Sequence, residues 1–384
     1  MARIGDETAG PALLLAGFAL AGSTAEASAL LAGVSLSAAL GGPVLGTLLD
    51  GAARPGRLLA GALVLYAAGL ALVLAGLGRL PFAVTVTTAV LTGLLGPALS
   101  GGWSAQLPRV ATGERLLRAN ALDTMTFGAA ALAGPALAGG TAEALGAPTA
   151  VVLATALIAS AAPAAWVLPV RAGPARRPRP APVVRALVSG TRAVLGNPRL
   201  ARATRVSVVS CVAQGMLTAC VPLLGERVLG GAGRGAVLFS CAAVSALAAD
   251  ALLARFPLAL SPDTVVRAGA LVQAVAPALA LTGGPVGPVA AFLVAGLGEG
   301  PQLTALFAVR HRESPERLRA QVFTTGASLK ITGFALGAAA AGPLAARSLP
   351  AALAAATATA LLAAVGGGRE RTGSGVTPSG RVPG

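Results

Sequence analysis

The groups in this chain that could do acid–base or ion-binding chemistry are a few charged side chains embedded in long apolar stretches. They are Asp6, Glu7, Asp123, Asp250, Glu299 and Lys330. A carboxylate can bind and release a proton or attract a cation, and a lysine ammonium can pair with a carboxylate or an anion. Because a charge in apolar surroundings is costly, each is a functional candidate whose role depends on the helices that hold it.

The composition predicts what those helices are. Of the 384 residues, 55% are hydrophobic and only 11% are charged, and the mean hydropathy is +0.78. Soluble domains carry about 25% charged residues. The stretches 58–78 and 81–108 contain no charged residue, and as helices they are long enough to cross a bilayer core of about 30 Å. We therefore expect an all-α integral membrane protein.

Apolar runs between arginine-bearing breaks predict twelve transmembrane helices in two pseudo-symmetric six-helix bundles. The expected spans are residues 2–22, 28–50, 57–78, 81–103, 119–141, 147–170, 203–224, 233–255, 264–283, 287–309, 320–343 and 348–366. They divide the chain into an N-terminal half (1–170), an inter-half linker (171–198), a C-terminal half (199–368) and a disordered tail (369–384). Helix 1 is the weakest span, because only residues 8–22 are free of charge and RIGDE (3–7) precedes them, so we expect it to be truncated or to begin upstream of Met1.

The arginines predict the orientation. Twenty-two lie in the connections on one side of the predicted bundle, and four lie on the other, namely Arg79, Arg227, Arg234 and Arg347. Cytoplasmic connections are rich in Arg and Lys, so both termini are expected in the cytoplasm of a bacterial cell, with the protein in its plasma membrane. The Pro- and Arg-rich linker then either sets the topology as a flexible connection or rests on anionic lipid headgroups.

An internal repeat supports two equivalent halves. The segment GERLLRAN (113–120) recurs as PERLRAQ (315–321), and both copies follow the fourth span of their half. Duplicated halves are typical of transporters.

One charged turn, GTLLDGAARPGR (46–57), separates spans 2 and 3 and contains Gly46, Asp50, Arg54, Gly56 and Arg57. It resembles the signature loop of the major facilitator superfamily, in which Gly and a spacer precede Asp-Arg and then Gly-Arg-Arg or Gly-Arg-Lys. Gly51 stands where Arg usually follows Asp. The resemblance extends to the twelve spans and the long central connection. It implies a secondary transporter that works as a monomer by alternating access.

Asp50 is expected at the C-terminal end of helix 2, where the helix dipole disfavours an anion. Arg54 and Arg57 are within loop reach, and the resemblance implies that Asp50 also faces the start of helix 11 in the other half. Gly46, one turn earlier, permits close helix approach. We expect these residues to form a conformational latch that favours the outward-open state. The alternative is a basic topology anchor with an incidental Asp.

The deepest charges are Glu299, in the middle of helix 10, and Lys330, in the middle of helix 11. They either pair with each other or bind substrate or protons. Asp123, near the start of helix 5, suits a helix cap or a bond between helices. Asp250 and Arg255, at the end of helix 8, are expected to form a local pair.

Asp6 and Glu7 fall in the first turns of helix 1. They either cap an exposed N-terminus or face the cavity and take up protons as its exposure alternates.

The segment GPALAGG in helix 5, with Gly134, Pro135, Gly139 and Gly140, resembles the Gly-Pro element of drug/proton antiporters in the superfamily, with one extra residue before the paired glycines. Its small residues are expected to allow packing against the other half. Helix 4 departs from the pattern, because it has no arginine where proton-driven exporters usually carry one.

Few polar side chains face the expected cavity, so the solute class predicted is small hydrophobic or amphiphilic molecules, exported with proton coupling. An importer or uniporter of a small metabolite, or a non-transporting sensor, are the alternatives. We expect no enzyme, metal site, cofactor or nucleic-acid partner. His311 is expected in a solvated loop, the three cysteines are expected to be buried apolar side chains, and no ATP-binding GxxxxGK[ST] motif occurs.

Overall fold

The structure, a computed structural model, describes residues 1–21, 24–170, 183–228, 230, 235–256, 260–282, 284 and 286–365, and most of these residues are helical. The first half contains α1 (Ala2–Ala21), α2 (Thr24–Gly51), α3 (Pro55–Gly76), α4 (Phe82–Gly93), η1 (Gly96–Ala98), α5 (Gly101–Ser104), η2 (Leu107–Arg109), α6 (Glu114–Leu145), α7 (Ala147–Ala159) and α8 (Ala162–Trp166). After α9 (Val183–Leu195), the second half contains α10 (Pro198–Ala219), α11 (Val221–Val228), α12 (Ala236–Arg255), α13 (Pro262–Leu279), α14 (Val286–Glu313), η4 (Glu316–Leu318), α15 (Arg319–Arg347) and α16 (Leu349–Val365).

Each of the twelve predicted spans falls on one helix or on one interrupted helix, so the all-α prediction is confirmed. Among the described residues, seven helical segments are long and apolar enough to cross a membrane by themselves: Pro55–Gly76, Phe82–Ser104, Ala147–Trp166, Pro198–Val228, Val237–Arg255, Val286–Glu313 and Glu316–Arg347. Helix α1 has 20 residues, which corresponds to about 30 Å of helix.

Three predicted spans are interrupted where a continuous helix was expected. The fourth breaks into α4, η1 and α5 around Pro97, the sixth breaks between α7 and α8 just before Pro163, and the seventh breaks between α10 and α11 just before Pro222. Proline has no backbone N–H and disfavours helical backbone at the preceding residue. The hydropathy pattern carries no signal of these breaks.

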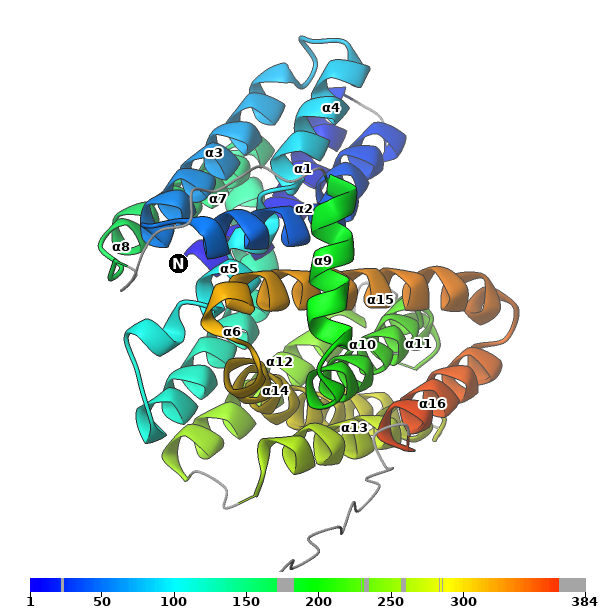
Figure 1. Ribbon diagram of the computed structural model, residues 1–384. Coiled ribbons are helices and arrows are strands. Elements are labelled where there is room, and N and C mark those ends of the chain that lie inside the picture. The colour runs from blue at the N-terminus through cyan, green and yellow to red at the C-terminus, as the bar shows by residue number, and fades with distance from the viewer. Residues whose placement is uncertain are drawn as a thin grey trace, which may run out of the picture.

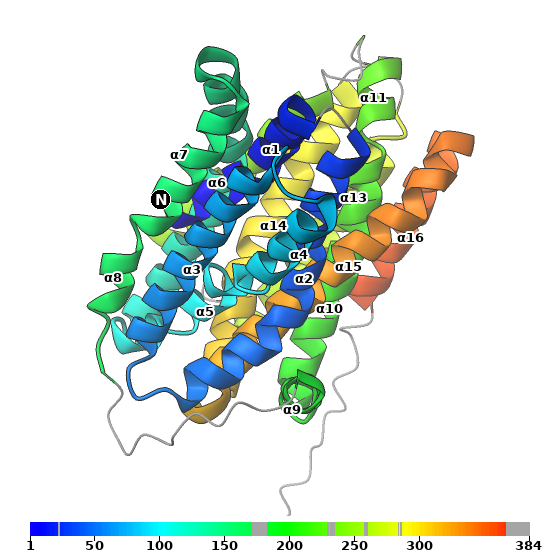
Figure 2. The same ribbon diagram turned by 90° about the horizontal axis from the view of Figure 1, so that it is seen from above.

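The helices form two bodies that lie side by side (Figure 2), with α1, α3, α7 and α8 on one side and α10, α13 and α16 on the other. In the first half α1 packs against α6 and α7, and α3 packs against α4 and α7. In the second half α14 packs against α12 and α13, and α10 packs against α15 and α16. The contact surface between the bodies, called the seam below, joins α2, α5 and α6 to α12, α14 and α15.

Small residues let the seam helices approach closely. A Cβ added to Gly42 of α2 would lie 2.5 Å from the Thr324 carbonyl oxygen of α15, and one added to Gly101 of α5 would lie 2.6 Å from the Phe323 carbonyl carbon. The Ser328 hydroxyl of α15 also donates to the Ala38 carbonyl oxygen of α2 at 3.1 Å. Glycine at these positions therefore places backbone against backbone.

The inter-half linker contains a helix that the sequence interpretation did not include. Helix α9 crosses from α10 toward α2 in front of α15 (Figure 1), and it contacts all three. The Gln321 side-chain amide of α15 donates to the Ser189 hydroxyl of α9 at 2.7 Å. A strongly amphipathic 13-residue segment can pack on both halves at once, so 183–195 is not a flexible connection. Residues 171–182 and the predicted tail 369–384 lie outside the described residues.

Candidate functional site at the seam

Asp50 joins the two halves at one end of the bundle, called the Asp50 end below. The residue lies in the last turn of α2, and its Oδ1 accepts a hydrogen bond from the Ala320 N–H at 2.9 Å. Its Oδ2 accepts from the Gln321 N–H at 2.8 Å. These two amides begin α15, where helix N–H groups lack intrahelical partners and carry partial positive charge. The carboxylate thus caps a helix of the other half with both of its oxygens.

The residues around Asp50 explain this placement. A Cβ added to Gly46, one turn earlier on α2, would lie 2.5 Å from the Gln321 Cα, so glycine brings the carboxylate within reach of α15. After the turn, Gly56 packs closely on Ala165 of α8, and the Arg57 guanidinium lies 4.8 Å from the ring centroid of Trp166. These two residues dock the turn on its own half, while Asp50 crosses the seam. Arg54 is exposed.

A second polar contact crosses the seam through hydroxyl groups. The Thr124 hydroxyl of α6 and the Thr304 hydroxyl of α14 are 2.5 Å apart, and Thr304 donates to Asp250 Oδ1 of α12 at 3.0 Å. Asp250 is 2% exposed. The predicted local pair with Arg255 is wrong, because Asp250 points into the seam whereas the Arg255 guanidinium lies over the Phe256 ring. Sequence reasoning missed this contact because two threonines carry no charge signal.

Aromatic rings form a third contact between the halves. Phe127 of α6 meets Phe307 of α14 edge to face, with ring centroids 6.2 Å apart, and Phe307 lies 5.3 Å from Phe323 of α15. The His311 ring lies 4.5 Å from Phe323. His311 is buried within α14, so its prediction as a solvated loop residue is wrong. Helix α14 continues past the expected end at 309, and in its last turn Arg310 and His311 are buried against α15 whereas Arg312 is exposed.

Asp123 is held inside the first half by a buried ion pair. Arg3 Nη1 of α1 donates to Asp123 Oδ1 of α6 at 2.7 Å, and the Ser104 hydroxyl donates to Oδ2 at 2.5 Å. The two charged residues are 9% and 6% exposed. The guanidinium of Arg3 also lies 3.7 Å from the Phe127 ring centroid. Asp123 therefore bonds α1 to α6. The sequence signal that could have pointed to its partner is the presence of a charged residue, Arg3, in an otherwise largely apolar helix.

The comparisons with known proteins agree with this geometry. The family model of the Major Facilitator Superfamily matches residues 1–338. The protein belongs to the major facilitator superfamily. An uncharacterized MFS-type transporter, y4rN, of Sinorhizobium fredii (strain NBRC 101917 / NGR234) is 30% identical over 287 residues, which are 73% of this chain and 70% of that protein.

Solved structures of superfamily transporters share the fold. The human organic anion transporter MFSD10 (TETRAN) matches with a TM-score of 0.70 at 16% identity, over 95% of this chain and 99% of that one. A bacterial homologue of the iron transporter ferroportin, in an outward-facing state with soaked iron, has a TM-score of 0.70 at 16% identity, over 95% of both chains. The E. coli fucose:proton symporter FucP has a TM-score of 0.63 at 14% identity, over 94% and 97%.

Membership of this superfamily confirms the integral membrane fold of twelve helices in two bundles. Superfamily members are secondary transporters that move small molecules across a lipid bilayer, so this chain is a transporter. In this fold the two helices of an interrupted pair, such as α7 and α8, together form one membrane span.

In this transporter Asp6 and Glu7 lie on α1, in the same half as the Arg3–Asp123 pair. The Tyr66 hydroxyl of α3 donates to Asp6 Oδ1 at 2.6 Å. Glu7 is exposed. Asp6 is thus tied to a neighbouring helix.

The Gly-Pro element of α6 was expected to pack against the other half, but it does not. A Cβ added to Gly134 would lie 2.5 Å from Glu7 Cβ of α1, in the same half. Gly139 and Gly140 have no atom of the described chain within 4 Å of such a Cβ. The reason is that α6 uses its first turns, around Thr124 and Phe127, for the seam, whereas its later turns, after Pro135, lie along its own half.

Glu299 and Lys330 do not form a direct ion pair in the part of the chain that the structure describes. Instead, the Gln214 amide of α10 donates to Glu299 Oε2 at 2.7 Å. Lys330 is partly exposed on α15. Both charged groups lie within electrostatic range of the Cys211 thiol on α10.

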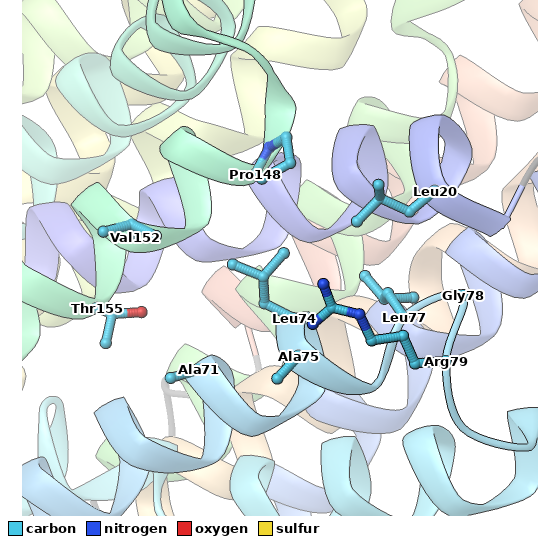
Figure 3. Close-up of a pocket in the computed structure, with 10 residues that line it drawn as sticks. All are labelled: Leu20, Ala71, Leu74, Ala75, Leu77, Gly78, Arg79, Pro148, Val152 and Thr155. Atoms are coloured by element: carbon cyan, nitrogen blue, oxygen red, sulfur yellow. The ribbon is translucent and has the colours of Figure 1, made fainter.

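A hollow of about 580 Å³ opens between α1, α3 and α7 (Figure 3), and it is lined by Leu20, Ala71, Leu74, Ala75, Leu77, Gly78, Arg79, Pro148, Val152 and Thr155. All of these residues belong to the first half, and Arg79 supplies the charged group. The hollow is apart from the seam and includes none of the residues that the sequence singled out for transport.

Proposed function

We propose that the protein exports small hydrophobic or amphiphilic molecules across the bacterial plasma membrane by alternating access, coupled to the proton gradient. The observation that carries the proposal is the cap that Asp50 places on α15 across the seam. Such a bond between two rigid halves holds one end of the bundle shut. Opening that end requires both hydrogen bonds to break.

The seam contacts gather at the Asp50 end. Thr124, Phe127 and Gly46 all lie within the part of their helices nearest that end, and so do their partners on α14 and α15. The arginine distribution supports a cytoplasmic position for this end. The described arrangement then corresponds to an outward-facing transporter, with α9 lying across the closed side. Transport follows when the halves rock and the Asp50 cap breaks.

Proton coupling needs a titratable group whose access alternates. Asp6 and Glu7 of α1 are the first candidates, and this is supported by the exposure of Glu7 and by the hydrogen bond of Asp6 to Tyr66 of a neighbouring helix. Glu299 of the second half is the other candidate, since its carboxylate is bonded to Gln214 of α10 in the same half. The scarcity of polar side chains in the spans supports an apolar or amphiphilic solute, and the resemblance of 134–140 to an antiporter element supports export.

The experiment is accumulation of rhodamine 123 and ethidium in an efflux-deficient bacterial host that expresses the protein. Export lowers accumulation, a protonophore restores it, and Asp50→Asn weakens the effect. Asp263→Asn is the matched control, because Asp263 is a partly exposed carboxylate paired with Arg312 at 2.7 Å, away from the seam. Higher accumulation than in empty cells would indicate import and contradict the proposal. Lower accumulation that a protonophore leaves unchanged would contradict the coupling.

A further inference from the structure

Arg310 is a buried guanidinium with unused donors. It lies in the last turn of α14 and is 1% exposed, and its Nε and Nη2 have no hydrogen-bond acceptor among the residues that the structure describes. The nearest aromatic centroids, those of Phe323 and Phe307, are 5.6 and 5.9 Å from its Cζ. An arginine remains charged in proteins, and a buried charge without a counter-ion is strongly destabilising. The two donors are therefore free to bind an anion from outside the described chain.

The guanidinium has a position built for it. A Cβ added to Gly326 of α15 would lie 2.5 Å from Arg310 Cζ, so glycine at 326 provides the room that the group occupies. The two unused donors, Nε–H and Nη2–H, form one edge of the planar guanidinium and point in parallel. This edge matches the two oxygens of a carboxylate or a similar oxyanion.

The surroundings of Arg310 are electropositive. The Cys211 thiol of α10 lies within electrostatic reach of Arg310, Lys330 and Glu299 together. Of these three charges the single negative one, Glu299, already accepts from the Gln214 amide. The charged groups near this thiol are thus two cations and one carboxylate that already accepts a hydrogen bond, and this balance favours an added anion.

His311 adds to the same region. Both of its ring nitrogens are buried and have no partner within the described part of the chain. It directly follows Arg310, and its ring lies against Phe323, which also contacts Arg310. An imidazole can donate one hydrogen bond when neutral and two when protonated, so it is a second potential donor beside the guanidinium.

We propose that Arg310 binds the anionic group of the transported solute, and that the protein accepts small amphiphilic organic anions. The Nε and Nη2 edge would hold the carboxylate or sulfonate group, and the rings of Phe307 and Phe323 would contact the apolar part of the solute. This inference rests on the proposed transport function. Phe307 lies beside Arg310 and also meets Phe127 of the other half. Separation of the halves breaks that contact, and this would give the solute access to Arg310.

The test uses two dyes that share the xanthene ring system and differ in charge. Fluorescein is anionic and rhodamine 123 is cationic, and fluorescence anisotropy of each reports binding to the purified full-length protein. We expect Arg310→Gln to weaken fluorescein binding at least tenfold and to change rhodamine 123 binding less than twofold. Arg310→Lys, which keeps the charge but loses the parallel donors, should fall in between. Arg312→Gln is the control on the same helix, since Arg312 is paired at the surface with Asp263.

A measurement on the unmutated protein covers the case in which the variants fail to fold. Added 1-naphthoate should raise the unfolding temperature, whereas 1-naphthalenemethanol, which has a similar ring and no charge, should not. Equal loss of both dyes in Arg310→Gln, or equal stabilisation by the two naphthalene compounds, would overturn the inference. So would a wild-type protein that binds neither fluorescein nor 1-naphthoate.

Reconstituted vesicles separate this inference from the proposed function. If fluorescein binds through Arg310 but is not moved by a proton gradient, the anion site stands and proton-coupled export fails. If rhodamine 123 is exported while fluorescein does not bind, export stands and the anion site fails.

Discussion

Replacing Asp50 with Asn is expected to shift the transporter toward the state that is open at the Asp50 end. The aspartate accepts two backbone hydrogen bonds with a charged group, and such bonds contribute about 1.5–3 kcal/mol each. Asparagine keeps one acceptor oxygen but turns an NH₂ group toward the second amide, and it loses the attraction to the helix dipole. Part of this loss is offset, because the Asp50 charge lies at the C-terminal end of α2, where the helix dipole disfavours an anion, and the substitution removes that unfavourable interaction.

The remaining difference is about 2 kcal/mol, which corresponds to an about 30-fold change in the ratio of closed to open molecules. The assay is a distance measurement between spin labels at Arg115→Cys on α6 and Arg255→Cys on α12. Both side chains are exposed on either side of the seam. The partly exposed Cys241 is replaced by Ser in this background. The wild-type protein should give mainly the short distance, and Asp50→Asn should add a longer one.

Asp263→Asn is the control for the loss of a carboxylate elsewhere, and it should leave the distance distribution unchanged. If Asp50→Asn has the same distribution as the wild type, the cap does not hold the end shut. The reasoning would also fail if both substitutions broadened the distribution equally, since the effect would then follow from general destabilisation.

The remaining predictions concern the other contacts. Arg3→Gln leaves the buried Asp123 carboxylate without its cation, so it should lower the free energy of unfolding by about 3–5 kcal/mol. The measurement is the unfolding temperature in detergent, which should fall. Arg3→Gln combined with Asp123→Asn should recover part of the lost stability. Gly134→Ala pushes α1 away from α6 and should lower the free energy of unfolding by about 1–3 kcal/mol. Gly140 has open space around it, so Gly140→Ala should change that free energy by no more than about 0.5 kcal/mol. Equal effects of the two substitutions would contradict the described packing of α1 on α6. Glu299→Gln should abolish uphill transport in proteoliposomes but retain counterflow, and loss of both would reject its role in coupling.

The course of the chain through the membrane could be predicted from local properties. Long uncharged runs form helices because backbone groups in apolar surroundings must bond within the segment, and twelve such runs with arginine-bearing breaks led to the correct fold. Asp50 could also be recognised from its neighbours, because Gly46, Asp50 and the following Gly and Arg residues lie within one short turn. Such signals are contained in a few consecutive residues.

The partners of the buried polar groups were decided by tertiary packing. Asp250 has Arg255 nearby in sequence but bonds to Thr304, which comes from another helix, and Arg3 finds Asp123 across 120 residues. Arg310 and His311 look like loop residues by composition, yet α15 buries them. The faces of an alanine- and glycine-rich helix differ little from one another, because small apolar residues lie on most of them. Which side meets which neighbour is therefore set by the arrangement of the whole bundle, and with it the residues that form the seam.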